Sequence, residues 1–149
     1  MELSTEGKQG RTIIARFKPG QELVLALTKF LQKKHIRACY IPVLLGGFKN
    51  LKMNSMTFGK SEDEPKQMEL EYRQPLDYFG NGTIAQIDDK PSIHIHLVAA
   101  QSGNKPISGH LVSGEIVLTT EIVIVEIEGA KFTRKPDREI FNYSLLYFK

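Results

Sequence analysis

Within residues 92–98, polar and branched apolar side chains alternate, and His94 and His96 stand between Ile93, Ile95 and Leu97. A period of two fits a β-strand and no helix, since successive strand residues point to opposite faces of a sheet. The two histidines therefore share one face, while Ile93, Ile95 and Leu97 enter the core from the other. Burial of these three side chains stabilises the strand by roughly 1.5–3 kcal/mol each. The pattern requires a sheet with one buried face and gives the histidines a rigid platform.

A third histidine, His110, follows a segment rich in turn residues, which predicts a β-hairpin over this part of the chain. The register of the hairpin decides whether His110 joins the other two. A loop centred on Gly103 places His96 opposite His110, and a loop centred on Ser102 places His94 there. A two-residue turn at 103–104 instead directs His110 to the opposite face. The sequence leaves these registers open.

Three neutral imidazoles and one water form an open tetrahedral Zn²⁺ site, which Ni²⁺ or Co²⁺ can also occupy. The alternative is a group of partly buried histidines held by hydrogen bonds. The cupin pattern does not match, because Ala100 stands where that pattern has a glutamate and Gly109 directly precedes His110. No catalytic residue is identifiable from spacing. Four carboxylates distant in sequence are candidates for a general base: Asp77, Glu115, Glu121 and Glu126.

One segment, residues 21–34, has helical periodicity, with Leu23, Leu27 and Leu31 on one stripe. Glu22 at its start and the basic residues 33–35 at its end suit the helix dipole. The other apolar stretches are short and β-prone. They predict strands over 12–17, 36–45, 48–58, 68–72, 83–87, 93–100, within 111–128 and over 143–148, with turns or bulges at 46–47, 80–82 and 132–137. This order predicts an α+β fold with a largely antiparallel sheet and one main N-terminal helix.

The length of 149 residues fits a single domain, which we expect over residues 11–149 after a flexible stretch at 1–10. The lone Cys39 lies in an apolar run and is interpreted as a core residue. The chain begins without a secretory signal pattern and has no apolar run of about 20 residues, so we expect a cytoplasmic protein with no membrane partner. A net charge of +3 permits an anionic partner without demanding nucleic acid.

Several segments together resemble the PPC (plant and prokaryote conserved) domain family, described as PD1-like and DNA-binding. The resemblance extends over nearly the whole chain. It is carried by Gly10-Arg11, the helix, 45–48 (Leu-Gly-Gly-Phe), 82–84 (Gly-Thr-Ile), 91–97 (Pro-Ser-Ile-His-Ile-His-Leu), 109–111 (Gly-His-Leu), Glu121 and 132–134 (Phe-Thr-Arg). Ser108 departs from the family pattern, which has Gly-Gly-His-Leu at this position.

The resemblance implies a homotrimer, with zinc held in some prokaryotic members by the histidines that match His94, His96 and His110. Asp77 and Glu121 match acidic positions of the family, which makes them candidates to support those ligands. The AT-hook of the plant members is absent, because residues 7–11 lack its Arg-Gly-Arg-Pro core. We expect a trimeric metal-binding module that binds DNA or acts in regulation. The alternatives are a small metalloenzyme or small-molecule-binding protein, and histidines that only strengthen the trimer.

Overall fold

The structure is a computed structural model that describes residues 3–58, 65–101 and 105–148. In these residues the chain forms eight strands, one α-helix and one short 3₁₀ helix. The elements are β1 (Lys8–Phe17), α1 (Leu23–Lys34), β2 (Cys39–Phe58), β3 (Pro65–Tyr72), β4 (Leu76–Ile87), β5 (Lys90–Gln101), β6 (Lys105–Glu128), β7 (Phe132–Asp137), η1 (Arg138–Ile140) and β8 (Tyr143–Phe148). The predicted α+β class with one main helix is confirmed. The turn residues of 59–65 also predict an exposed loop, of which 59–64 lie outside the described residues and Pro65 begins β3.

The helix α1 begins two residues later than predicted because Glu22 caps it. The Glu22 carboxylate accepts hydrogen bonds from the backbone N–H groups of Val24 and Leu25, which lack partners within the helix. The helix ends at His35, whose φ of 55° is left-handed. The stripe predicted from the sequence is the buried one, since Leu23, Leu27 and Leu31 are fully buried.

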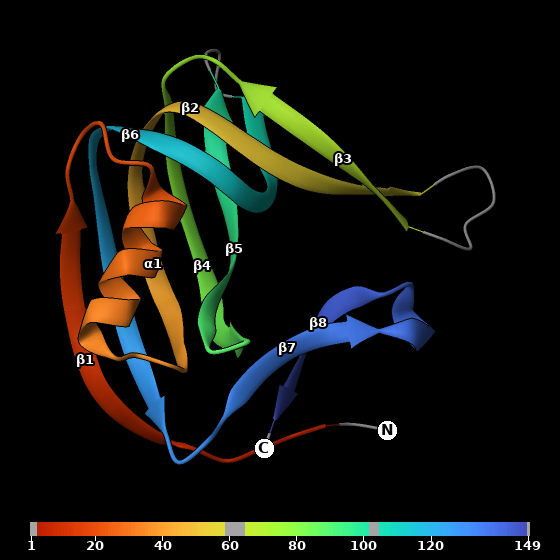
Figure 1. The fold of residues 1–149 in the computed structure, drawn as a ribbon. Coiled ribbons are helices and arrows are strands. Elements are labelled where there is room, and N and C mark those ends of the chain that lie inside the picture. Colours follow the sequence, from red (N-terminus) through yellow and green to blue (C-terminus); the bar gives the residue numbers. More distant parts are fainter. Residues whose placement is uncertain (1–2, 59–64, 102–104, 149) are drawn as a thin grey trace.

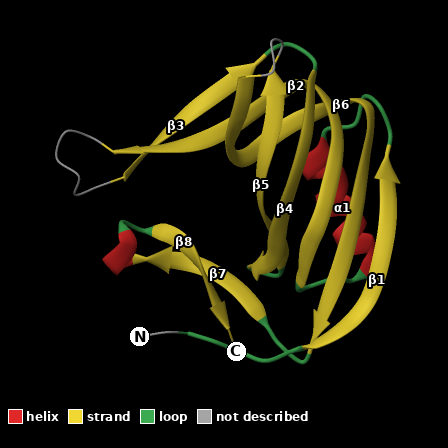
Figure 2. Cartoon of the chain, turned by 180° about the vertical axis from the view of Figure 1, so that it is seen from behind, coloured by secondary structure: helices red, strands yellow, loops and turns green. Residues whose placement is uncertain are grey.

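The strands form one sheet in which β2, β6, β5 and β4 pair with one another in a closed ring. All strand pairs in the described residues are antiparallel except β4 with β7. The helix α1 covers one face of the sheet (Figure 1). In the view from behind, β1 and β6 lie in front of the helix (Figure 2). The β7–β8 hairpin lies at the lower end, next to the end of β4.

The strand β2 continues through Gly46 and Gly47, where the sequence predicted a turn or bulge that ends the strand, and its pairing with β6 has a register shift between Gly46 and Phe48. Gly46 is required here by close packing, because a Cβ atom would lie 2.9 Å from the Cα atom of Thr120 in β6. Gly46 is paired with both Tyr78 of β4 and Thr120 of β6, whose hydroxyls are hydrogen-bonded to each other. Pro42 lies at a bulge, seen as a register shift between Ile41 and Leu44 in the pairing of β2 with β4.

Two other predicted turns are strands. Gly80 and Gly82 lie in the middle of β4, opposite Leu97 and Ile95 of β5. Their role is close approach, since a Cβ on Gly82 would lie 2.7 Å from the Cγ1 atom of Ile95. Residues 132–137, predicted as a turn, form β7 and pair with β8. Pairing across the sheet therefore overrides the local turn composition in both places.

The hydrophobic core lies between α1 and the inner face of the sheet. It contains Leu27, Phe48, Cys39, Ile95 and Leu97, all at most 2% exposed. Because Ile95 and Leu97 point into this core, His94 and His96 point to the outer face, away from the helix. No helix in the described part of the chain is long and apolar enough to cross a membrane.

Candidate metal centre

The pairing of β5 with β6 brings the three histidines together. His96 lies opposite His110, the register that corresponds to a loop centred on residue 103. The turn residues 102–104 lie outside the described residues, so the register comes from the strand pairs that flank them. His94, two residues before His96 on β5, projects from the same face. The hairpin therefore has a register that places His110 on the same face as His94 and His96.

The cluster has the dimensions of a metal site. One ring nitrogen of each histidine lies within 4.8 Å of those of the other two. The ring centroids are 5.0 Å apart for His94 with His96 and with His110, and 5.5 Å apart for His96 with His110. Zn²⁺ binds imidazole nitrogens at about 2.0–2.1 Å in a tetrahedral arrangement. The three ligand atoms are therefore close enough together to be candidates for a shared ion.

Burial and nearby positive charge favour the neutral form of two of the three histidines, His94 and His110. Burial, the Arg134 guanidinium and the two neighbouring histidines lower the pKa of His94 from 6.5 to about 4. Burial, His96 and Arg134 also lower the pKa of His110. Metal coordination requires the unprotonated imidazole. His94 and His110 are therefore ready to bind a cation at neutral pH without first releasing protons.

Polar, uncharged residues lie opposite the histidines on the neighbouring strands. Asn81 and Thr83 of β4 are paired with His96 and His94, and Asn54 of β2 is paired with His110. A cavity of about 500 Å³ adjoins His96, and a second of about 410 Å³ adjoins both His94 and His96. The outer side of the cluster is thus accessible to a small ligand.

The carboxylates proposed from the sequence lie along other parts of the sheet. Asp77 is on β4, opposite Ala100, four residues before Asn81 and so roughly 13 Å from it along the strand. Glu121 is opposite Leu45, whereas His110 is opposite Asn54 on the same strand. Among the described residues, no carboxylate of this chain is hydrogen-bonded to the cluster.

The two other candidate bases are already paired. Glu115 accepts hydrogen bonds from Lys49 and Asn50. Glu126 accepts two from Arg11, which lowers the pKa of that carboxyl. These contacts give both carboxylates structural partners and leave the three histidines as a site with neutral ligands.

Arg134 is the charged residue of the site that the sequence did not single out. It lies on β7, is 9% exposed, and its Nη2 donates a hydrogen bond of 2.8 Å to the Thr83 hydroxyl. Thr83 is the residue opposite His94. In the sequence, Arg134 stood out only as part of the segment 132–134 that resembles the family. The parallel pairing of Gln86 with Thr133, which brings β7 next to β4, has no recognisable pattern in the sequence.

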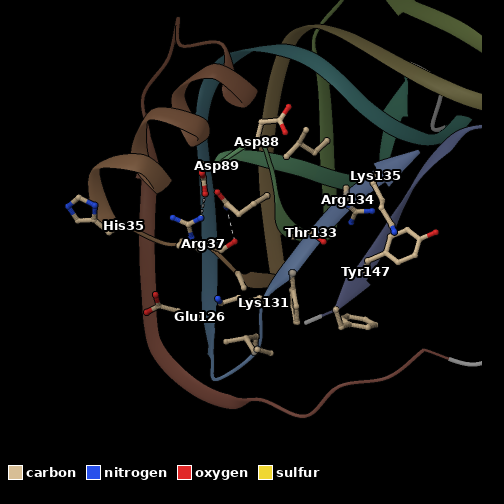
Figure 3. Close-up of a pocket in the computed structure, with 17 residues that line it drawn as sticks. His35, Arg37, Asp88, Asp89, Glu126, Lys131, Thr133, Arg134, Lys135 and Tyr147 are labelled. Carbon is tan, nitrogen blue, oxygen red and sulfur yellow. Dashed lines mark hydrogen bonds and ion pairs between the residues drawn. The ribbon is translucent and has the colours of Figure 1, made fainter. Parts of the chain in front are cut away.

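The same arginine belongs to the wall of a larger cavity. This cavity of about 700 Å³ lies between the β7–β8 hairpin and the ends of α1, β4 and β6 (Figure 3). Its charged lining includes Arg37, Lys131 and Lys135 as well as Asp88 and Asp89. Arg134 thus stands between this cavity and the histidine cluster.

A histidine-only donor set on two rigid, paired strands suits borderline divalent ions. Its imidazoles favour zinc, nickel, cobalt or copper over the oxygen-seeking magnesium and calcium. Three protein ligands leave a fourth position for water or another small ligand. When a zinc ion is bound, it acts as a Lewis acid toward whatever occupies that position.

The fold and this cluster define a class: an α+β domain with three clustered histidines on the outer face of a largely antiparallel sheet. The chain belongs to the family of the Plants and Prokaryotes Conserved (PCC) domain, whose model matches residues 4–128. The resemblance inferred from the sequence is thereby confirmed. No curated protein matches the sequence.

Solved structures share the fold along almost the entire chain. A protein described as metal-containing, from Archaeoglobus fulgidus, is 23% identical with a TM-score of 0.82, covering 95% of this chain and 97% of that one. A PPC protein from Pyrococcus horikoshii is 24% identical with a TM-score of 0.81 and 97% coverage of both chains. A protein from Bacteroides thetaiotaomicron described as a candidate DNA-binding protein is 19% identical, with a TM-score of 0.75 and 96% coverage of both.

Proposed function

We propose that this protein is a metal-binding PCC-domain protein in which His94, His96 and His110 hold one Zn²⁺ ion with an open fourth position. The observation that carries the proposal is the convergence of three imidazole nitrogens within 4.8 Å. The lowered pKa of His94 and His110 supports it, because both ligands are unprotonated at neutral pH. The Archaeoglobus protein, described as metal-containing, has the same fold.

Metal analysis of the purified protein tests the site directly. We expect about one zinc per chain in the wild type and in His35→Ala, whose histidine caps α1 outside the cluster. We expect His94→Ala and His110→Ala to lose the metal, because two imidazoles bind zinc much more weakly than three. Zinc retained by both cluster variants, or absent from a wild type supplied with zinc, contradicts the proposal.

We infer that the chain assembles as a homotrimer through the outer face of its sheet. Four apolar side chains on this face are exposed in the single chain, although they would be expected in a core: Ile14, Val43, Leu45 and Phe79. They lie in adjacent rows, since Ile14 and Val43 are both opposite Val123, and Leu45 is opposite Phe79. A continuous apolar area of this kind is typical of a subunit interface.

The histidines lie on the same outer face, so the metal has two candidate roles. If it forms part of a ligand site, chelation removes zinc and leaves the trimer intact. If it only strengthens the trimer, chelation dissociates the subunits. The arrangement favours the ligand site, because all three imidazoles come from one chain and are already close together. Native mass spectrometry before and after chelation separates the two roles.

DNA binding is a second candidate function, supported by the description of the Bacteroides structure and by the net charge of +3. Several basic residues are engaged within the chain: Arg37, Lys49 and Lys52 form ion pairs, and Arg134 is buried. Exposed basic residues outside these ion pairs include Lys29, Lys33, Lys34, Lys135 and Arg138, which are candidates for phosphate contacts.

Fluorescence anisotropy with a labelled DNA duplex tests this function. We expect the association constant to fall steeply between roughly 50 and 200 mM salt, because contacts with the DNA phosphates release counterions. Lys33→Gln should weaken binding of all sequences alike. An absence of binding at low salt would rule out this second function and leave the metal site unaffected.

A further inference from the structure

The side chain of Arg134 is a buried cation without an anionic partner. It is 9% exposed and its Nε atom is buried with no hydrogen-bond partner among the described residues. None of the ion pairs in the described residues includes it. Its one side-chain hydrogen bond, from Nη2, goes to the neutral hydroxyl of Thr83. A buried guanidinium normally has a carboxylate or phosphate to offset the cost of removing it from water.

The one side-chain hydrogen bond of the guanidinium leads to the histidine cluster. The Thr83 hydroxyl that holds the guanidinium is on the residue opposite His94, on the outer face of β4 and β5. The positive charge of Arg134 is close enough to lower the pKa of both His94 and His110. Arginine and histidines therefore share one local environment, although β7 contributes the first and β5 and β6 the others.

The charges in this environment do not balance. The three ligands are imidazoles, which carry no negative charge, Thr83, Asn81 and Asn54 are uncharged, and no carboxylate of this chain is hydrogen-bonded to the cluster in the described residues. A divalent metal ion next to a guanidinium would give a strongly positive site, and bound cations dominate the local electrostatics. An incoming anion would find two complementary binding groups, a metal with an open position and an arginine fork with free donors.

We propose that Arg134 and the metal on His94, His96 and His110 together bind a small oxyanion, a carboxylate or a phosphate. One oxygen occupies the open position of the metal, and a second accepts hydrogen bonds from the guanidinium. Thr83 is a positioning residue that fixes the guanidinium through its hydroxyl. This inference rests on the metal site proposed above and adds the chemical class of its ligand.

Cobalt-substituted protein provides the measurement, because the visible spectrum of Co²⁺ changes when its fourth ligand is exchanged. We expect acetate and inorganic phosphate, each added at constant ionic strength against sodium chloride, to shift the wild-type spectrum in a saturable manner. The anion with the tighter binding distinguishes a carboxylate from a phosphate site. In Arg134→Gln we expect full cobalt content and roughly ten- to a hundredfold weaker anion binding, as for loss of charge-assisted hydrogen bonds.

Two further variants keep the test decisive. Lys90→Gln removes an exposed positive charge from β5, the strand of His94 and His96, and should bind anions like the wild type. Arg134→Lys keeps the charge without the fork and should be intermediate; it replaces Arg134→Gln as the test if the latter does not fold. Cobalt binding without any anion effect, or equal anion affinity in the Arg134 variants, overturns this inference alone. A wild type that binds neither zinc nor cobalt overturns the proposed function and this inference together.

Discussion

Cys39 shows how burial removes the reactivity of a titratable group. Its side chain is fully buried in the core, and burial together with the charge of Glu126 raises the pKa of the thiol to about 12. The reactive thiolate is therefore almost absent at neutral pH. The interpretation of Cys39 as a core residue is confirmed by its position.

We expect the Cys39 thiol of the native protein to be unreactive toward a chromogenic disulfide reagent at pH 8. The reagent needs both access and thiolate, and burial withholds both. In denaturant the same thiol should react to completion with one equivalent per chain. Rapid modification of the native protein at the rate of a free thiol would contradict this expectation.

His94 links stability to pH in the metal-free protein. Its pKa in the folded chain is about 4, below its ordinary value of 6.5, so the unfolded chain binds more protons between these values. The contribution to stability is fully present above about pH 6.5 and is lost as the pH falls towards 4. We expect the melting temperature of the chelated protein to drop across this window, by less in His94→Ala. His35→Ala, outside the cluster, should keep the wild-type slope.

At the scale of elements, β4 and β5 approach each other closely at the glycines beside the histidine strand. A Cβ on Gly82 would meet the His94 carbonyl oxygen and lie 2.7 Å from the Ile95 side chain. Both are parts of a paired strand that has little freedom to move. The geometry of the histidine platform thus depends on the absence of a side chain in β4.

We expect Gly82→Ala to lower the free energy of unfolding by about 1–3 kcal/mol, as for other cases of overpacking. It should also weaken zinc binding, because relief of the clash moves the backbone of His94. Urea denaturation and zinc titration measure the two effects. Gly10→Ala is the control, since its Cβ would meet only the flexible Glu128 side chain; an equal loss in both variants would contradict the close-approach argument.

The spacing of apolar residues in the sequence predicted much of the fold. The stripe Leu23, Leu27 and Leu31 predicted the helix, and the alternation around His94 predicted a strand with a buried face. At Gly46 and Gly82 the sequence predicted turns or bulges, and both residues lie within strands where a Cβ would meet a paired strand, because local composition does not show which distant strand a glycine contacts. The role of Arg134 could not be predicted for the same reason, since its hydrogen-bond partner Thr83 is 51 residues away in the sequence.

The whole molecule presents two unlike faces. Helix α1 covers the inner face of the sheet (Figure 1), whereas the outer face has Ile14 at 80% exposure and Phe79 at 64%. The histidine cluster lies on this outer face, continuous with the row that contains Phe79, because Asn81 and Thr83 follow Phe79 on the same side of β4. An interface on this face would bring neighbouring subunits close to the metal site.

We expect light scattering to give a mass of three 16.9 kDa chains for the wild type. Ile14→Glu should dissociate the trimer, since a carboxylate would be buried without a partner in the interface. Its effect on the fold of one chain should be small, because Ile14 makes little contact within it. Leu25→Glu on the exposed side of α1 is the matched control and should remain trimeric. A monomeric wild type, or a trimeric Ile14→Glu, would show that the outer face is not the subunit interface.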